Sequence, residues 1–225
     1  MSEEFSENVE GEYSSDEEEV EMTAADVLQK LEEAWLNEKF APNLLESKVE
    51  IVECMLEQME QMEENVKRCK KGDFRIIVHR MEIDRIRYVL SSYLRIRLEK
   101  IEKYVHHILH KESTRGPDEP NMLSPEEFAF AKEFAESIES HAQQVVLRHM
   151  PPNLQNLDKQ KLVPKPNLDS YVFLRANERQ EHVLIEPELE DEQNADVVDL
   201  EAGSQYIMRY RPIGSLVASG AVSLI

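Results

Sequence analysis

The sequence predicts a mainly α-helical protein, an N-terminal helical bundle followed by a small β-rich C-terminal domain. Apolar residues recur at helical spacing up to about residue 150, whereas later they come in short β-rich runs. Glycine is scarce, with 6 among 225 residues, which favours helices over an all-β fold. We therefore expect a helical A domain over residues 23–152, a linker over 153–167 and a B domain over 168–225.

The first predicted helix begins at Thr23. Thr23 is a good N-cap, and Asp26 stands at the third helical position, where a carboxylate is favourable. Apolar residues then recur at helical spacing, namely Val27, Leu28, Leu31 and Trp35. A break follows at Ala41-Pro42.

The second predicted helix opens on a capping box formed by Ser47 and Glu50 and ends at Gly72, a residue suited to the C′ position. One apolar stripe runs along it, made of Val52, Met55, Met59, Met62 and Val66. A second, acidic stripe lies on a neighbouring face, made of Glu50, Glu53, Glu57, Glu60 and Glu64.

The third predicted helix is long, from about Phe74 to Lys111, and opposite in charge to the second. Residues 67–103 carry twelve bases and five acids, whereas residues 48–66 carry six acids and one base. This contrast predicts antiparallel packing with ion pairs between the helices, each worth only a few tenths to about one kcal/mol. The apolar positions that we expect to supply most of the stability include Phe74, Ile77, Met81, Val89, Tyr93, Leu94, Ile101, Tyr104, Val105, Ile108 and Leu109.

The fourth predicted helix begins at Ser124-Pro125-Glu126-Glu127, where the cap, the proline at the first helical position and the third-position glutamate agree. Pro151-Pro152 ends the helical region. We expect its buried face to contain Phe128, Ala131, Phe134, Ala135, Ile138, Ala142, Val145 and Val146.

The B domain is predicted from short β-rich runs, with a turn at residues 201–204 and one helical turn at residues 216–219. The runs are residues 171–174, 183–185, 197–198, 206–210 and 221–225. A unit this small, without a disulfide or a metal site, rarely builds a sufficient core by itself. We expect it to need a partner surface, either the A domain or another chain.

The acidic residues are concentrated in two segments. The formal net charge is −20, but residues 1–22 hold ten acids and residues 186–201 hold eight, with no base in either segment. The remaining chain has 28 acids and 26 bases and is close to neutral. We expect residues 1–22 to be a disordered acidic tail, since they contain too little apolar surface to fold. The tail is either a solvating arm or a kinase target or partner-binding peptide, because Ser14 has Glu17 three residues on.

Composition argues against membrane insertion, secretion and tight nucleic-acid binding. The acidic N-terminus resembles neither a signal nor a transit peptide. The longest uncharged apolar run, residues 213–225, is shorter than the roughly 20 residues that a membrane span needs. A chain this acidic should bind little DNA alone, because affinity for phosphate comes mainly from Lys and Arg. We expect a soluble intracellular protein with free thiols at Cys54 and Cys69.

Catalytic and metal-binding patterns are weak throughout. No glycine pair has the spacing of a phosphate-binding loop. His106 and His110 are four residues apart and could chelate a metal, but a solvated helix end is the favoured interpretation because no further ligand is close in sequence. Cys54 is better explained as a core residue than as a nucleophile. We expect no catalytic residue, no cofactor and no metal.

Two further features each admit a structural and a functional interpretation. The basic run made of Lys67, Arg68, Lys70 and Lys71 could contact nucleic acid, but it also suits a helix C-terminus. The structural interpretation is favoured because no aromatic residue is interleaved with the run. Trp35 is more often a packing anchor than part of a ligand cage. What remains is surface, so an interaction subunit is favoured over an enzyme.

Several stretches of the sequence resemble the Sld-five family of GINS-complex subunits. They lie, in the order of that family, at residues 34–42, 44–46, 85–95, 150–154, 163–166, 169–175 and 216–222. Together they span about residues 27–225, and in this order they are highly specific. Two of them are Ala34-Trp35-Leu36-Asn37-Glu38-Lys39-Phe40-Ala41-Pro42 and Asp169-Ser170-Tyr171-Val172-Phe173-Leu174-Arg175. The acidic tail is similar only in character.

The resemblance implies a helical A domain, a β-rich B domain and a heterotetramer with three related Psf-type subunits. That tetramer joins the MCM ring and the Cdc-type cofactor in the CMG helicase, required for initiation of DNA replication and for fork progression. The MCM ring hydrolyses ATP, and the chain would be a scaffold that also docks other replisome proteins. It would lie in the nucleus, on chromatin during S phase, with some in the cytoplasm.

Partner contacts are expected from aromatic and arginine side chains and from the apolar B-domain strands. The A-domain candidates are Trp35, Phe40, Tyr88, Tyr93 and Arg95. The B-domain candidates, for partner contact or assembly, are Tyr171, Phe173, Leu174, Leu216, Val217, Leu224 and Ile225. Some of these residues will belong to the chain's own core, and we expect Leu224-Ile225 to be packed rather than frayed.

Two other functions are compatible with the residues. One is a helical adaptor of another nuclear complex, whose β unit binds a peptide. The other is a DNA-binding module that uses residues 67–103, which would show binding that weakens steeply with salt.

Overall fold

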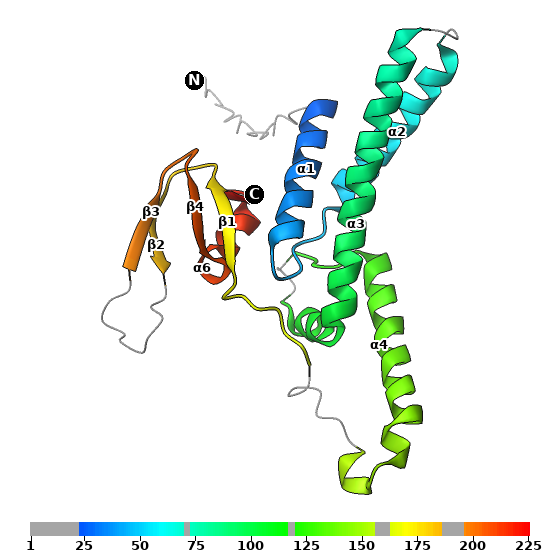
Figure 1. Cartoon of the computed structure of the whole chain (residues 1–225), viewed down its shortest axis with the longest axis vertical. Helices are drawn as coiled ribbons and strands as arrows, with labels where there is room; N and C mark the ends of the chain where they lie inside the picture. The colour runs from blue at the N-terminus through cyan, green and yellow to red at the C-terminus, as the bar shows by residue number, and fades with distance from the viewer. Residues whose placement is uncertain (1–22, 70–72, 117–119, 156–162, 186–195) are drawn as a thin grey trace, which may run out of the picture.

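The structure is a computed structural model that describes residues 23–69, 73–116, 120–155, 163–185 and 196–225 (Figure 1). A helical domain is followed by a small domain with antiparallel strands, which confirms the predicted fold class. The tail 1–22, Gly72, Lys70, Lys71, residues 156–162 of the predicted linker and residues 186–195 of the acidic loop lie outside the described residues.

Helix α1 (Ala24–Phe40) starts as predicted. The Thr23 side chain accepts a hydrogen bond from the Asp26 backbone N–H, and the Asp26 carboxylate accepts from the Thr23 backbone N–H. This capping box satisfies donors that the first helical turn leaves unpaired. The helix ends at Ala41, whose extended backbone leads into Pro42.

Helix α2 (Val49–Arg68) does not start as predicted. Its N-cap residue is Lys48, and no side chain caps the helix, so the predicted capping box of Ser47 and Glu50 is wrong. The Lys48 backbone N–H instead donates to the Tyr93 hydroxyl (3.4 Å), a contact between segments 45 residues apart. A long-range contact has replaced the local one.

Helix α3 (Phe74–Thr114) is the longest element and runs antiparallel to α2 (Figure 1). Arg87 Nη2 lies 2.8 Å from Glu63 Oε1 of α2, which confirms the predicted ion pairing between the helices. The non-helical backbone at Tyr104 (φ −122°, ψ 25°) kinks α3. Four of its predicted core positions are instead exposed: Phe74, Ile77, Met81 and Leu94.

Helix α4 (Pro125–Val145) is capped by Ser124 and Glu127 as predicted, but its predicted buried face is mostly wrong. Only Ala131 and Ala135 of that face are buried, because α4 packs on α3 near its start and its far end projects away (Figure 1). Short 3₁₀ turns at Leu147–His149 and Pro152–Leu154 follow it. The exposed apolar residues of this face are Phe128, Ile138, Val145 and Val146.

The B domain contains two antiparallel sheets. One has the order β4-β1-β5, from Gln205–Arg209, Tyr171–Ala176 and Val222–Leu224. The other pairs β2 (Gln180–Ile185) with β3 (Asp196–Leu200). The predicted turn at residues 201–204 is confirmed, and its Gly203 has φ +82°, a conformation that glycine adopts without strain.

Helix α6 (Tyr210–Ser219) covers the B-domain sheet and is longer than the single turn predicted at residues 216–219. It begins where β4 ends, so Tyr210 is helical rather than part of the predicted strand. Gly220 ends it with φ +81°, the left-handed conformation usual after a helix. The B-domain core gathers the inner faces of strands and helix: Val172, Leu174, Ala176, Val183, Leu200, Met208, Tyr210, Ile213, Val217, Val222 and Leu224.

The B domain packs against the A domain of the same chain. Ala41 is buried in the B-domain core, and Leu45 packs against it. The Leu224 backbone N–H donates to Asn37 Oδ1 of α1 (2.7 Å), while Leu224 itself is buried. The small domain therefore completes its core with residues that follow α1, one of the two possibilities that its size predicts.

Tyr210 makes this core sensitive to alkaline pH. Burial raises the pKa of Tyr210 from 10.0 to about 12. The unfolded chain releases this proton near pH 10 and the folded chain only near pH 12. The free energy of unfolding therefore falls as the pH rises between these values, by roughly 2–3 kcal/mol for this group.

We expect the Tyr210→Phe variant to lose this contribution to the pH dependence. Urea unfolding of both proteins from pH 9 to pH 12 measures the free energy of unfolding of each. Across that range the variant should lose less stability than the parent. A difference that stays constant with pH would contradict the prediction.

Candidate interaction surfaces

Arg97 lies at the centre of a buried cluster of charged residues that joins three helices. Its guanidinium binds Glu127 of α4 through two hydrogen bonds, Nε–Oε1 (2.7 Å) and Nη2–Oε2 (2.9 Å). Nη1 also donates to Glu38 Oε2 of α1 (3.2 Å). The remaining N–H groups donate to the backbone carbonyls of Leu45 (3.0 Å) and Met122 (2.7 Å).

Lys100 completes this cluster and balances its charge. Its ammonium lies 2.7 Å from Glu38 Oε1 and donates to the carbonyl of Asn43 (2.8 Å) and to that of Glu38. Two cations thus face two carboxylates, and Arg97 is fully buried. Burial opposes the charge on Arg97, but its hydrogen bonds to Glu127 leave the pKa raised. Burial lowers the pKa of Lys100, and Glu38 partly offsets this.

The cluster fixes structure and performs no evident chemistry. All five guanidinium N–H groups have acceptors, so no donor is left for a substrate. The cluster of Arg97, Lys100, Glu38 and Glu127 was not predicted from the sequence, although one feature of the sequence indicates it. Arg97 stands four residues from both Tyr93 and Ile101, which are core residues of the same helix, so a charge at that position needs a buried partner.

We expect the Arg97→Met variant to lose about 3–5 kcal/mol of stability, because Glu127 and Glu38 would stay buried without their partner. Urea unfolding of the full chain measures this loss. The same substitution at Arg85 is the matched control. Arg85 is half exposed in its ion pairs with Glu32 and Glu82, so its loss should cost below about 1 kcal/mol. Equal losses for the two variants would contradict this account.

The predicted A-domain contact residues divide into exposed and buried positions. Tyr88 is 62% exposed, Arg95 is exposed, and Phe40 lies at the surface near the end of α1. Trp35 is half-buried, and its indole N–H donates to Ser92 Oγ (2.9 Å). Tyr93 is only 2% exposed and belongs to the chain's own core. The hydrogen bond of Trp35 to Ser92 and its packing against the helical core support the interpretation of Trp35 as a packing anchor.

Tyr88 and Arg95 lie on one outward face of α3. The Tyr88 ring stands edge-on to Trp35, with ring centroids 6.2 Å apart. Leu98 follows Arg95 by three residues and Leu94 by four, and both leucines are also exposed. We call the four residues Tyr88, Leu94, Arg95 and Leu98 the α3 outer face. It combines an aromatic ring, aliphatic side chains and an arginine, the composition usual at interface centres.

The B-domain sheet has a second apolar surface. Along β1 the side chains alternate, so Val172, Leu174 and Ala176 are buried while Tyr171 and Phe173 are exposed. Phe173 lies opposite Ile207 of β4, which is also exposed. We call Tyr171, Phe173 and Ile207 the B outer face. Its β1 residues were predicted from the sequence, whereas Ile207 was not, because alternation alone does not show which side of a strand meets the protein's own core.

The other predicted B-domain residues belong largely to the core. Leu174, Val217 and Leu224 are buried, and Leu216 is half-buried against the same cluster. Ile225 is exposed, but its backbone N–H donates to the Phe173 carbonyl (3.2 Å). The expectation that the final residues are packed rather than frayed is therefore met by Leu224 and by the backbone of Ile225.

The candidate chemical groups lie apart in the structure. His106 Nδ1 lies 3.7 Å from Glu139 Oε1, and the pKa of His107 is lowered by burial and by Lys111. Among the described residues no group of three or more His, Cys, Asp or Glu side chains could hold a metal ion. Cys54 packs with the α1–α2–α3 core, as predicted.

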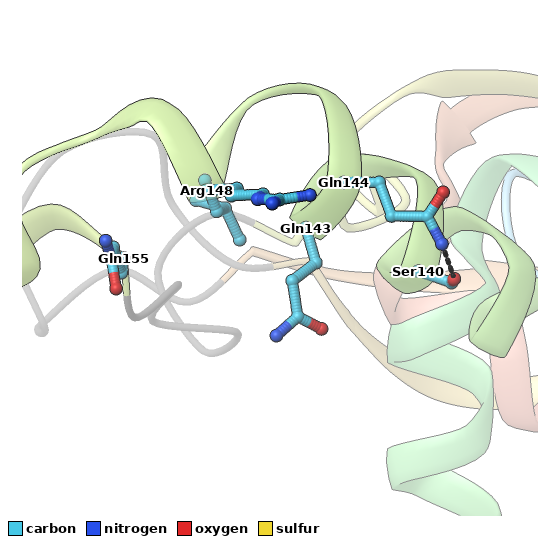
Figure 2. A pocket seen from close by; sticks show the side chains of 6 residues that line it. Ser140, Gln143, Gln144, Arg148 and Gln155 are labelled. Carbon is cyan, nitrogen blue, oxygen red and sulfur yellow. Dashed lines mark hydrogen bonds between the residues drawn. The ribbon is translucent and has the colours of Figure 1, made fainter.

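A polar hollow of about 310 Å³ lies near the end of α4, lined by side chains of Ser140, Gln143, Gln144, Arg148 and Gln155 (Figure 2). Ser140 accepts a hydrogen bond from Gln144 Nε2 (3.3 Å). No histidine or carboxylate lines the described part of this hollow, so nothing there would activate the hydroxyl as a nucleophile.

Among the helices of the described residues, none combines the length and the apolar character that a membrane span requires.

Several arginines of the basic segment 67–103 are engaged within the protein. Arg85 pairs with Glu32 and Glu82, Arg87 pairs with Glu63 and Asp84, and Arg97 is buried. A phosphate backbone would have to displace these carboxylates, which reduces the gain from counterion release. These three arginines join α3 to α1, α2 and α4.

The fold joins a helical domain to an attached β domain, and each domain has an exposed apolar face, an arrangement typical of interaction subunits. Residues 5–146 match the family described as GINS complex protein helical bundle domain, and residues 166–225 match the DNA replication complex GINS protein SLD5 C-terminus. The chain belongs to the SLD5 family of GINS proteins.

Relatives in animals and plants share nearly the whole length. The rat DNA replication complex GINS protein SLD5 is 63% identical over 208 residues, covering 92% of this chain and 93% of the relative. The human protein of that name is 61% identical over 208 residues, with the same coverage. The Arabidopsis thaliana protein of that name is 33% identical over 214 residues, covering 91% of this chain and 93% of the relative.

Proposed function

We propose that the chain is a non-catalytic, structural subunit of the GINS complex and acts in DNA replication by holding that complex together. The observation that carries the proposal is the pair of apolar outer faces, on α3 and on the B-domain sheet, in a chain whose residues 5–146 and 166–225 match the SLD5 family. A folded protein seldom leaves such faces uncovered unless another chain contacts them.

The partners are the other GINS subunits, in a heterotetramer with three Psf-type chains. In the A domain we assign the contacts to Tyr88, Arg95 and Phe40, with Trp35 supporting Tyr88 from behind. In the B domain we assign them to the B outer face and Ile225. The projecting half of α4 offers further apolar surface through Ile138, Val145 and Val146.

The tetramer in turn joins the MCM ring and the Cdc-type cofactor as a component of the CMG helicase and offers docking surface to other replisome proteins. In this proposal the MCM ring hydrolyses ATP, and the present chain supplies no catalytic residue or cofactor. The protein acts in the nucleus and binds chromatin during S phase as part of this assembly, with some in the cytoplasm.

We expect the Phe173→Glu variant to disrupt this assembly. The glutamate would put an unpaired charge into an apolar contact, a change that costs several kcal/mol when one partner is buried. Co-expression with the other GINS subunits, followed by affinity capture and mass spectrometry, measures how much of each subunit is recovered.

The control variant Phe173→Tyr keeps the ring and should retain assembly. Since Phe173 is 59% exposed in the chain alone, neither substitution should change the thermal unfolding of the chain by more than about 1 kcal/mol. Full recovery of the partner subunits with Phe173→Glu would remove the B outer face from the proposal. Recovery of unrelated chains with the parent protein would favour a different adaptor function.

The isolated chain should bind DNA weakly or not at all, since its net charge is −20 and its basic helix is internally paired. Fluorescence anisotropy with a labelled duplex, at low and at physiological salt, measures this. Tight binding that weakens steeply with added salt would favour the DNA-binding alternative for residues 67–103.

A further inference from the structure

The first turns of α3 carry an exposed apolar stripe. Phe74, Ile77, Val78 and Met81 recur at intervals of three and four and so share one face of the helix. Phe74 is 72% exposed and Met81 is 68% exposed, and the other two are also exposed. We call these four residues the N-terminal stripe of α3. Single exposed apolar residues are common, but four on one face form a patch that marks a contact surface.

Further along the chain, α1 contacts residues of the same face of α3, although Tyr88 stays largely exposed. Continuing the helical interval from Met81 leads to Arg85, Tyr88 and Ser92. Arg85 pairs with Glu32 of α1, and both Tyr88 and Ser92 contact Trp35 of α1. The N-terminal stripe is thus the continuation of the α1-binding surface beyond the part that α1 contacts.

The two helices run in the same direction. Their contacts advance together along both chains, from Glu32 with Arg85 to Glu38 with Arg97. Figure 1 shows α3 extending past the start of α1 at the end where both helices begin. The segment that would continue the course of α1 along α3 is therefore the one that precedes α1 in the sequence.

The chain before Thr23 leaves α1 at the level of the stripe. Ala24 lies eight residues before Glu32, and Ile77 lies eight residues before Arg85. Each interval spans about 12 Å along its helix, at 1.5 Å per residue. Residues 1–22 thus connect to the described structure beside the exposed side chains, and they need only a short path to reach Phe74.

The charges around the stripe suit this segment. On the helical wheel Arg75 flanks the stripe on one side and Arg80 on the other, and Lys67 and Arg68 stand at the nearby end of α2. Arg75 is exposed, and its pair with Asp73 is long, at 3.8 Å. Residues 1–22 contain ten acids and no base, together with a few apolar side chains, which include Phe5, Val9, Tyr13, Val20 and Met22.

We propose that residues 1–22 of this chain dock on its own N-terminal stripe of α3. Their apolar side chains cover Phe74, Ile77, Val78 and Met81, and their carboxylates pair with Arg75 and Arg80. In this arrangement the acidic tail covers an exposed apolar surface of its own chain. A partner that binds this end of α3 has to displace the tail, and added negative charge at Ser14 or Ser15 would strengthen the docking.

Oxidation of Met81 tests the proposal on the full chain. A thioether covered by other residues reacts more slowly with hydrogen peroxide than an exposed one. We expect deletion of residues 1–22 to speed Met81 oxidation about threefold or more, and Met150, which is exposed elsewhere, to react at an unchanged rate. Peptide mass spectrometry over a time course gives both rates. A rate that does not depend on protein concentration places the docking within one chain.

A charge-reversed variant keeps the tail and tests its attachment. Arg75→Glu with Arg80→Glu should speed Met81 oxidation as much as the deletion does, whereas the control pair Arg95→Glu with Lys103→Glu, exposed positions further along α3, should leave it unchanged. Equal Met81 rates with and without residues 1–22 would overturn the proposal. So would protection that depends on concentration, which would assign the stripe to a second copy, or that appears only when another GINS subunit is added.

Discussion

The burial of Arg97 is the constraint on which the rest of the A domain depends. A guanidinium removed from water is tolerated only when its donors all have acceptors and its charge is balanced. Those acceptors come from α1, α4 and the loops at Leu45 and Met122, so all of these segments have to be in place together. Helices that pack only through apolar stripes can shift along each other, whereas the hydrogen bonds of Arg97 form in only one arrangement of the helices.

That constraint extends to the B domain through the segment between α1 and α2. The Leu45 carbonyl accepts from Arg97, while the Leu45 side chain packs on the B-domain core. Leu44, the preceding residue, points the other way into the α3–α4 core. Packing inside the chain thereby covers one side of the B sheet and leaves Tyr171 and Phe173 exposed on the other.

Local sequence signals predicted the fold well where local interactions decide it. The caps at Thr23 and Ser124 are set by residues three positions apart and were predicted correctly. The capping box at Ser47 failed, because the Lys48 backbone binds Tyr93, 45 residues away. The predicted buried face of α4 was wrong because an apolar stripe indicates a contact surface but does not show whether the contact lies within this chain.

The interaction residues show the same limit. Tyr88 and Tyr93 are both tyrosines of one helix, yet one faces outward and the other forms part of the core. On β1, alternation separates Tyr171 and Phe173 from Val172 and Leu174 but leaves open which pair meets the protein's own interior. The Arg97 cluster needed residues from three helices, and no spacing within one helix contains that information.

The shared segment of residues 41–45 also bears on how the protein responds to damage. Because Ala41, Leu44 and Leu45 belong to cores on both sides of the joint, opening one domain removes contacts from the other. The two domains are thus coupled into one cooperative unit, although each has its own sheet or bundle. A destabilising substitution deep in the B domain would therefore be felt at α1 and α3, so that inherited or engineered lesions far from any subunit contact can still lower the amount of competent protein.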